Sequence, residues 1–161
     1  MKARWTPPTS NRIKINFDGS VWQDGSTTYG HICRDDKGEV THVGAKRGMD
    51  ASPLLTEALA LQFACTEASR LGFTHIHLEG DNCIVIDAVQ GLGRDIWEID
   101  IIVADIRNVL ACLQEVLISH VYREANSAAD KVADLAHLFP VADIPAHPDF
   151  VATVRKDAIG R

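Results

Sequence analysis

Apolar and polar residues alternate over residues 12–17, with the period of two that is typical of a half-buried β-strand. The polar positions continue to Asp18, and Gly19 is expected to turn the chain. Two further strands are predicted over residues 27–34 and 40–46, and the Asp-Asp-Lys-Gly segment between them is typical of a hairpin turn. Three consecutive strands with short links form an antiparallel meander.

The pattern changes after residue 50, where apolar residues begin to recur at spacings of three and four. Ser52 and Pro53 are suited to begin a long amphipathic helix, and Gly72 is suited to end it. The remaining pattern predicts, in chain order, a strand over residues 76–78, helices over 83–89 and 99–113, a strand over 116–121 and a helix over 126–137. This order predicts an α/β protein in which a five-stranded mixed sheet is flanked by helices.

The length of 161 residues suits a single domain. We assign this domain to residues 12–139, with an N-terminal tail over 1–11 and a proline-containing C-terminal tail over 140–161 that packs on the domain or trails from it. No segment approaches the roughly 18 consecutive apolar residues of a membrane-spanning helix, and the first residues contain no apolar signal-peptide core. We therefore expect an intracellular protein, with nucleus, cytoplasm and organelle all open.

Composition adds two constraints on function. The four cysteines lie far apart and never form a Cys-x-x-Cys pair, so they predict neither a zinc site nor a disulfide framework. The net charge of −6 is unfavourable for a nucleic-acid-binding protein, because lysines and arginines that neutralise phosphates supply most non-specific affinity. Either the partner is not a nucleic acid, or bound metal and a local basic patch supply the positive charge.

Four acidic residues occupy positions that folding alone does not explain. Asp18 follows the first strand, and Asp81 follows the fourth. Glu57 lies beside the apolar stripe of the first long helix, and Asp130 lies one turn into the last helix. Taken alone, each acid also has an ordinary structural interpretation, as a turn residue, a helix cap or an acid in the first turn of a helix. As a set, they can converge on one edge of the sheet, where four carboxylates repel one another without a cation.

Such a group of carboxylates predicts a site for hard divalent cations. Mg²⁺ prefers oxygen ligands and commonly shares its coordination shell with phosphate oxygens. Two such ions about 4 Å apart can activate a water molecule and stabilise the departing oxygen of a phosphodiester. No Ser-His-Asp order, Cys-His nucleophile, phosphate-binding loop or dinucleotide-binding glycine motif competes with this interpretation. The acidic residues therefore indicate metal-dependent phosphodiester hydrolysis.

Four short stretches are each weak signals but are highly specific in this order and at these distances. They are Asn-Phe-Asp-Gly-Ser at 16–20, Thr-Glu-Ala-Leu-Ala-Leu at 56–61, Glu-Gly-Asp-Asn at 79–82, and the segment from His120 to Ala133 with its Arg-Glu-Ala-Asn-Ser-Ala-Ala-Asp core. With them, the chain resembles the type 1 ribonuclease H family over about residues 13–138. The likeness is greatest to the ribonuclease H-like domains of plant genomes and plant retroelements.

The resemblance implies a ribonuclease H-like fold and a specific activity. It places the metal ligands of the family at Asp18, Glu57, Asp81 and Asp130. It implies that two Mg²⁺ or Mn²⁺ ions support endonucleolytic cleavage of the RNA strand of an RNA/DNA hybrid, leaving a 3′-hydroxyl and a 5′-phosphate. The residues expected to contact the hybrid are Gly19, Ser20, Asn82, Arg123 and Asn126. The backbone at the first two is suited to approach the minor groove, where the 2′-hydroxyl distinguishes RNA from DNA.

The chain departs from the family pattern at two places. Many members have a histidine in a flexible, glycine-containing loop before the last aspartate, where it helps the product leave, whereas this chain has Arg123-Glu124-Ala125 there. His120 is interpreted as a structural strand residue, and Arg123 could contact phosphate or form a surface salt bridge. The basic hybrid-binding extension is also missing, so a fused or partner domain is expected to supply positive charge.

Two other functions remain open from the sequence alone. An exonuclease of the same broad fold would use the same set of carboxylates. A nucleic-acid-binding module of ribonuclease H-like fold, with little or no turnover, is favoured by the acidic net charge and by the missing loop histidine. The intact set of four acids favours the enzyme.

Overall fold

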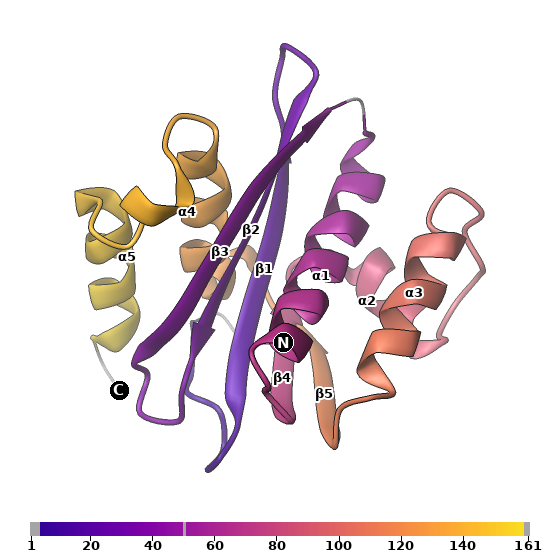
Figure 1. Ribbon diagram of the computed structural model, residues 1–161, viewed down its shortest axis with the longest axis horizontal. Coiled ribbons are helices and arrows are strands. Elements are labelled where there is room, and N and C mark those ends of the chain that lie inside the picture. The colour runs from indigo at the N-terminus through magenta and orange to yellow at the C-terminus, as the bar shows by residue number, and fades with distance from the viewer. Residues whose placement is uncertain (1–3, 50, 160–161) are drawn as a thin grey trace.

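The computed structural model describes residues 4–49 and 51–159. Its centre is a five-stranded mixed sheet with the strand order β3-β2-β1-β4-β5 (Figure 1). The strands are β1 (Ile13–Val21), β2 (Ser26–Arg34), β3 (Val40–Met49), β4 (His75–Gly80) and β5 (Glu115–His120). The first three strands are antiparallel, whereas β4 pairs in parallel with both β1 and β5. The predicted sheet is therefore confirmed.

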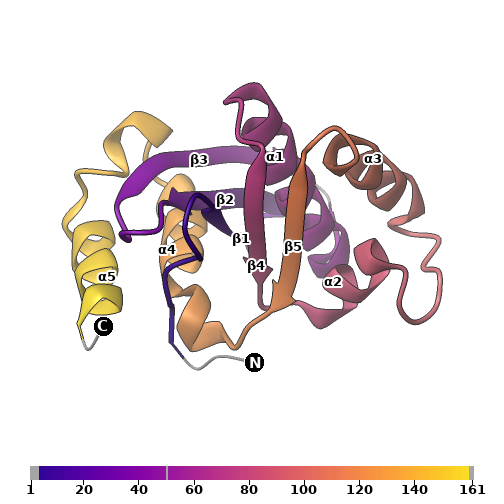
Figure 2. The ribbon, with the colours of Figure 1, turned by 90° about the horizontal axis from the view of Figure 1, so that it is seen from below.

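Helices cover both faces of this sheet, as the two views in Figures 1 and 2 show. The helices are α1 (Pro53–Arg70), α2 (Cys83–Gln90), α3 (Asp100–Leu110), α4 (Ser127–Ala136) and α5 (Pro148–Ala158). Helices α1, α2 and α3 enclose one hydrophobic core, and α4 and α5 enclose a second core on the opposite face. Successive side chains of β2 point to opposite faces of the sheet, so Cys33 packs in the first core and its neighbour Ile32 packs in the second.

Local sequence accounts for where helices α1 and α2 begin. The hydroxyl of Ser52 accepts a hydrogen bond from the backbone N–H of Leu55, and Pro53 occupies the first turn of α1. The side chain of Asn82 caps α2 in the same way, and Gly91 ends that helix in the left-handed conformation. These caps place the beginnings of α1 and α2 close to the strands that precede them.

The first strand differs from its prediction in two respects. The chain does not turn at Gly19, because β1 continues to Val21, which pairs with Thr27 across the hairpin. The strand is also not half-buried, since the polar residues Lys14 and Asn16 are as inaccessible as the apolar ones. The reason is tertiary: both faces of the sheet are covered, so the polar face of β1 is buried as well.

The described residues on either side of 12–139 include side chains that pack against the domain. Trp5 is buried, and its indole N–H donates a hydrogen bond to Asn16. After a short 3₁₀ turn (Val141–Asp143), helix α5 places Phe150 in the second core. The sequence pattern does not predict this helix, because three prolines interrupt the segment. Within the described residues, no helix combines the length and the apolar character needed to cross a bilayer.

Candidate metal-binding active site

Strand register brings two of the predicted acids together. Asn16 of β1 lies beside Glu79 of β4 in the parallel pairing. Asp18 lies two residues after Asn16, and Asp81 lies two residues after Glu79. Side chains two residues apart on a strand point to the same face of the sheet. The two carboxylates therefore come together where β4 ends, as the sequence analysis predicted for Asp81.

A close approach between β1 and α1 adds Glu57 to this pair. A Cβ atom at Gly19 would lie 2.8 Å from the Thr56 methyl carbon and 2.9 Å from the Thr56 carbonyl oxygen, so only glycine fits there. The backbone N–H of Gly19 donates a hydrogen bond of 3.2 Å to Oε1 of Glu57. Gly19 therefore fixes the position of the Glu57 carboxylate.

Three carboxylates lie within a small, mostly buried volume. Each of Asp18, Glu57 and Asp81 offers an oxygen, and these oxygens all lie within 4.8 Å of one another. Only 6% of Asp18 and 9% of Glu57 is exposed. Burial and the neighbouring Glu57 raise the pKa of Asp18 far above its usual range, and burial also raises the pKa of Glu57. In the metal-free protein, ionising the whole group is therefore unfavourable.

Asp130 of α4 lies beside these three carboxylates. It lines a pocket of about 340 Å³ together with the other three acids, Gly19, Ser20, Val21 and Arg123. Burial and the charge of Asp130 raise the pKa of Asp81. Asp134, further along α4, also has a pKa raised by burial and by Asp130, but it does not line the pocket. The sequence does show that Asp134 follows Asp130 by four residues, a spacing that makes two side chains neighbours on a helix.

The predicted substrate-contacting residues have different surroundings. Gly19, Ser20 and Arg123 line the pocket, and the exposed guanidinium of Arg123 lies 4.0 Å from Oδ1 of Asp130. Asn82 uses its side-chain oxygen to cap α2. Asn126 is buried, and its amide binds Asn16 and the carbonyl of Phe17. The structure thus gives Asn82 and Asn126 structural contacts and does not bring them to the pocket wall.

The region before Asp130 is compact. Residues Arg123–Asn126 form one 3₁₀ turn between β5 and α4, and no histidine lies in it. His120 is the last residue of β5, and its Nε2 lies 2.9 Å from the carbonyl oxygen of Asp81. Since this contact positions the backbone of a site residue, the structural interpretation of His120 is consistent with its surroundings.

The donor set of the pocket fits a divalent cation. All four predicted ligands supply carboxylate oxygens, which Mg²⁺ and Mn²⁺ prefer over nitrogen or sulfur. Oε2 of Glu57 is buried and has no hydrogen-bond partner among the described residues. A buried, unpartnered carboxylate oxygen is costly unless a cation or a proton neutralises it.

Replacing Asp18 by asparagine is expected to stabilise the metal-free protein by about 1 kcal/mol at neutral pH. An acid whose pKa is higher in the folded state than in the unfolded state destabilises the fold as pH rises from about 4. The wild type in EDTA should therefore lose stability from this pH upward, and Asp18→Asn should lose less. Urea unfolding at several pH values measures this difference.

The exposed Asp95 provides the matched control. Asp95→Asn removes one negative charge outside the pocket and should leave the pH profile as in the wild type. If Asp18→Asn is less stable than the wild type in EDTA at every pH, the carboxylates do not repel one another as described.

Comparison with known proteins agrees with the fold. The family model described as reverse transcriptase-like matches residues 16–136, and no curated protein matches the chain. The ribonuclease H1 of the halophilic archaeon Halobacterium salinarum is 26% identical, with a TM-score of 0.74 over 78% of this chain and 97% of that one. The likeness to plant domains in particular stays a prediction.

Two less similar structures share the fold. The N-terminal ribonuclease H domain of a Mycobacterium tuberculosis protein is 18% identical, with a TM-score of 0.71 over 90% of this chain and 97% of that one. LC11-RNase H1, whose source is compost, has been solved with an RNA/DNA hybrid; it is 19% identical, with a TM-score of 0.70 over 76% of this chain and 94% of that one. The chain belongs to the reverse transcriptase-like family of ribonuclease H-like domains.

Proposed function

We propose that the protein is a metal-dependent endoribonuclease that hydrolyses the RNA strand of RNA/DNA hybrids. The observation that supports this most strongly is the convergence of Asp18, Glu57, Asp81 and Asp130 on one open pocket. A fold does not need four carboxylates at one place, because their repulsion and desolvation are unfavourable without a cation. The ribonuclease H1 structures with this fold support the choice of reaction.

The four acids would hold two Mg²⁺ or Mn²⁺ ions. Such ions supply activation of the attacking water and neutralisation of the charge that develops on phosphate. The chain orients the ligands: Gly19 holds Glu57 through its N–H, and burial holds Asp18 in place. In the proposed reaction water attacks phosphorus and releases a proton to solvent, the bond to the 3′-oxygen breaks, and that oxygen takes up a proton from solvent to become a hydroxyl.

Selectivity for RNA is proposed to arise beside the acids. Gly19 and Ser20 line the same pocket as the four carboxylates. The backbone of these two residues would lie close to the sugar of a bound RNA strand, where a 2′-hydroxyl can both donate and accept hydrogen bonds. One structural relative, LC11-RNase H1, has been solved with an RNA/DNA hybrid, which supports this choice of substrate.

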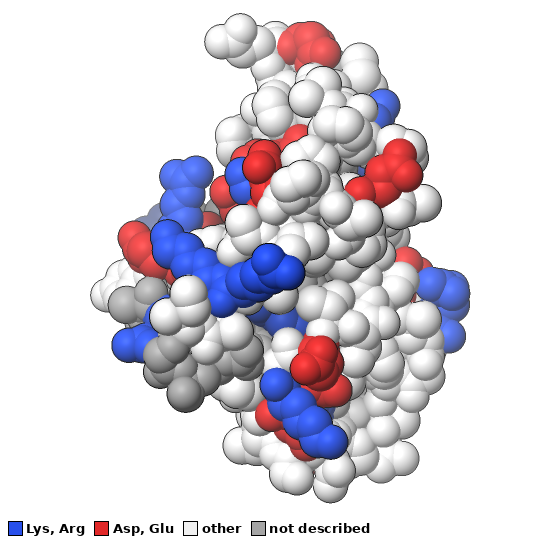
Figure 3. All heavy atoms as spheres, turned by 90° about the vertical axis from the view of Figure 1, so that its left-hand side faces the viewer, with Lys and Arg blue, Asp and Glu red and all other residues white. Residues whose placement is uncertain are grey.

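The charge distribution supports the proposal that a fused or partner domain assists binding. The net charge is −6. On the face shown in Figure 3, Lys and Arg side chains are interspersed with Asp and Glu, and the described residues there form no continuous basic surface. Since affinity for hybrids depends on neutralised phosphates, the isolated chain should bind weakly, and with few such contacts its binding should depend only shallowly on salt.

The test is cleavage of a labelled RNA/DNA hybrid, beside duplex RNA, duplex DNA and single strands, with Mg²⁺, Mn²⁺ or EDTA. We expect internal cleavage of the RNA strand of the hybrid alone, and only with metal. Products released stepwise from an end would instead identify an exonuclease. Hybrid binding without any cleavage in either metal would identify a binding module, and cleavage in EDTA would exclude metal catalysis.

Arg123→Ala is expected to weaken hybrid binding or slow turnover several-fold, with little change in the melting temperature. The guanidinium is exposed at the pocket and pairs with Asp130 only at 4.0 Å, so its loss removes a phosphate contact rather than a core interaction. Lys37→Ala, in the exposed turn at the far end of β2, is the control and should leave kinetics unchanged. Normal kinetics with a large loss of stability would make Arg123 structural.

A further inference from the structure

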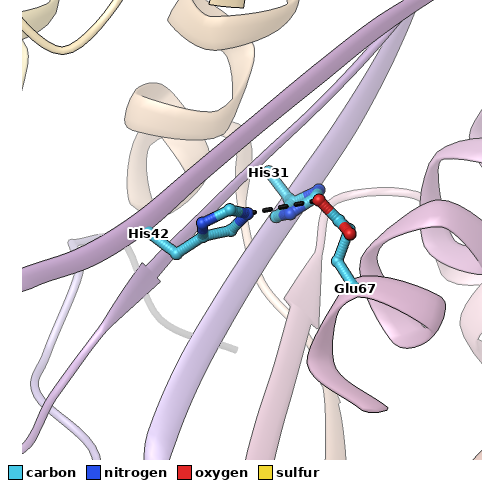
Figure 4. A group of neighbouring side chains, drawn as sticks. All are labelled: His31, His42 and Glu67. Carbon is cyan, nitrogen blue, oxygen red and sulfur yellow. Dashed lines mark hydrogen bonds and ion pairs between the residues drawn. The ribbon is translucent and has the colours of Figure 1, made fainter. Parts of the chain in front are cut away.

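A second cluster of metal-ligating side chains lies away from the four acids. His31 of β2, His42 of β3 and Glu67 of α1 point toward one another, as Figure 4 shows. Each residue offers one ligand atom, and these atoms all lie within 4.8 Å of one another. Nε2 of His42 and Oε1 of Glu67 are 3.3 Å apart. Three elements that are distant in sequence thus contribute to one small site.

His31 is the least ordinary member of this cluster. The residue is 0% exposed, and neither of its ring nitrogens has a hydrogen-bond partner among the described residues. Burial and the neighbouring His42 lower the pKa of His31 to about 3, so its imidazole is neutral at physiological pH. A neutral imidazole presents a lone pair to a metal, whereas a protonated ring cannot bind one.

The surroundings of His31 hold its ring in one place. Gly44 lies opposite His31 in the β2–β3 pairing, and a Cβ atom there would lie 2.1 Å from Cε1 of the imidazole. The ring therefore occupies the space that a side chain at residue 44 would need. Phe63 of α1 packs edge-on against the same ring, with 4.8 Å between the ring centroids. A ligand held from two sides loses little conformational entropy when it binds a metal.

The other two members give the cluster access to solvent. The side chains of His42 and Glu67 are 22% and 17% exposed. The second carboxylate oxygen of Glu67 accepts a hydrogen bond of 2.6 Å from Nε of Arg70, one helical turn further along α1. Such an outer contact orients a metal-binding carboxylate, as partners beyond the ligands commonly do.

We propose that His31, His42 and Glu67 form a transition-metal site, with zinc as its preferred occupant and water as the fourth ligand. Two imidazoles and one carboxylate suit Zn²⁺, whereas Mg²⁺ prefers oxygen ligands alone. Tetrahedral bonds of about 2.1 Å place ligand atoms roughly 3.4 Å apart. The His42–Glu67 pair, at 3.3 Å, already has about this separation, and the ligand atom of His31, which lies within 4.8 Å of the other two, must come closer by at most about 1.4 Å.

This site is separate from the nuclease pocket in position and in chemistry. Glu57 and Glu67 both belong to α1 but lie ten residues apart, which corresponds to about 15 Å along a helix. Zinc at the second site would tie β2 and β3 to α1, and so hold the sheet edge against the helix that carries Glu57. Its effect is therefore expected on stability, whether or not the chain has nuclease activity.

The test uses the metal-stripped full chain with Zn²⁺, and with Co²⁺ as a coloured substitute. We expect one tightly bound Zn²⁺, a rise in melting temperature by mass action, and the visible absorption of four-coordinate Co²⁺. His42→Gln and Glu67→Gln should each lower zinc affinity about 100-fold or more, since even partners outside the ligand shell are worth roughly 10–100-fold. His31→Phe keeps an aromatic ring but removes both ring nitrogens, and should fold without binding zinc.

Three control variants show whether zinc binds through His31, His42 and Glu67 in particular. Arg70→Ala breaks the ion pair with Glu67 but removes no ligand, and His75→Gln removes a histidine outside the cluster. Asp81→Asn alters the nuclease pocket. His75→Gln and Asp81→Asn should leave zinc affinity and the Co²⁺ spectrum unchanged, whereas Arg70→Ala should keep the Co²⁺ spectrum and lower zinc affinity by no more than about 10–100-fold. No zinc-dependent shift in the wild type would overturn the proposal, as would zinc binding that His42→Gln leaves intact or that Asp81→Asn abolishes.

Discussion

Hybrid cleavage by Asp81→Asn is expected to fall about a thousandfold at saturating Mg²⁺, while the protein stays folded. Asp81 belongs to the group of three carboxylates whose oxygens lie within 4.8 Å of one another, and asparagine keeps its shape but not its charge. The loss should appear in kcat, because the charge is needed where negative charge develops on phosphate. Single-turnover cleavage of a labelled hybrid, with circular dichroism to verify folding, measures both effects.

Asp95→Asn is the matched control for this experiment. It makes the same chemical change at an exposed position in the loop between α2 and α3, outside the carboxylate pocket. Cleavage by this variant should equal that of the wild type. If Asp81→Asn retains wild-type activity, or loses no more activity than Asp95→Asn, Asp81 is an ordinary residue at a strand end and the proposed metal site is wrong.

Lys14→Met should destabilise the protein by about 3–5 kcal/mol, the largest stability change expected of any substitution proposed for this chain. Nζ of Lys14 lies 3.1 Å from Oε2 of Glu79, and both side chains are almost completely buried. Nζ also donates a hydrogen bond of 2.7 Å to the carbonyl of Thr6. Removing the ammonium leaves the carboxylate of Glu79 in the interior without its cation, which is the costly outcome. Urea unfolding at neutral pH measures the difference.

A second substitution shows whether the unpaired charge causes this loss. Lys14→Met combined with Glu79→Gln removes both charges but keeps an amide near Asn16, so much of the stability should return. Glu115→Gln breaks the exposed ion pair with Arg12 and should change stability by less than about 1 kcal/mol. Equal losses in the single and double variants would indicate lost packing rather than an unpaired charge.

The sequence alone predicted the order and type of the five strands and of the helices from α1 to α4. Alternation and helical spacing report which faces of a segment are apolar, and both depend only on neighbouring residues. The same local patterns put Asp18 and Asp81 late in or directly after strands, and Glu57 and Asp130 early in helices. Because elements of a mixed sheet meet at shared edges, those positions indicated that the four acids can converge, while each acid alone still had an ordinary alternative.

Tertiary structure decided what covers each face and which distant polar groups meet. Periodicity along β1 could not reveal that helices cover both faces of the sheet, so Lys14 and Asn16 were assigned to an open face and are buried instead. Asn126 was expected at the substrate and lies inside the protein, because its partners Asn16 and Phe17 come from a strand more than 100 residues earlier.

The cluster of His31, His42 and Glu67 was invisible for the same reason. Its members are spread over three elements, with no motif spacing among them. Their meeting depends on the absence of a side chain at Gly44 and on the packing of α1 against the sheet. Local sequence determines the periodicity and ends of each element, whereas contacts between distant polar side chains exist only once those elements have packed.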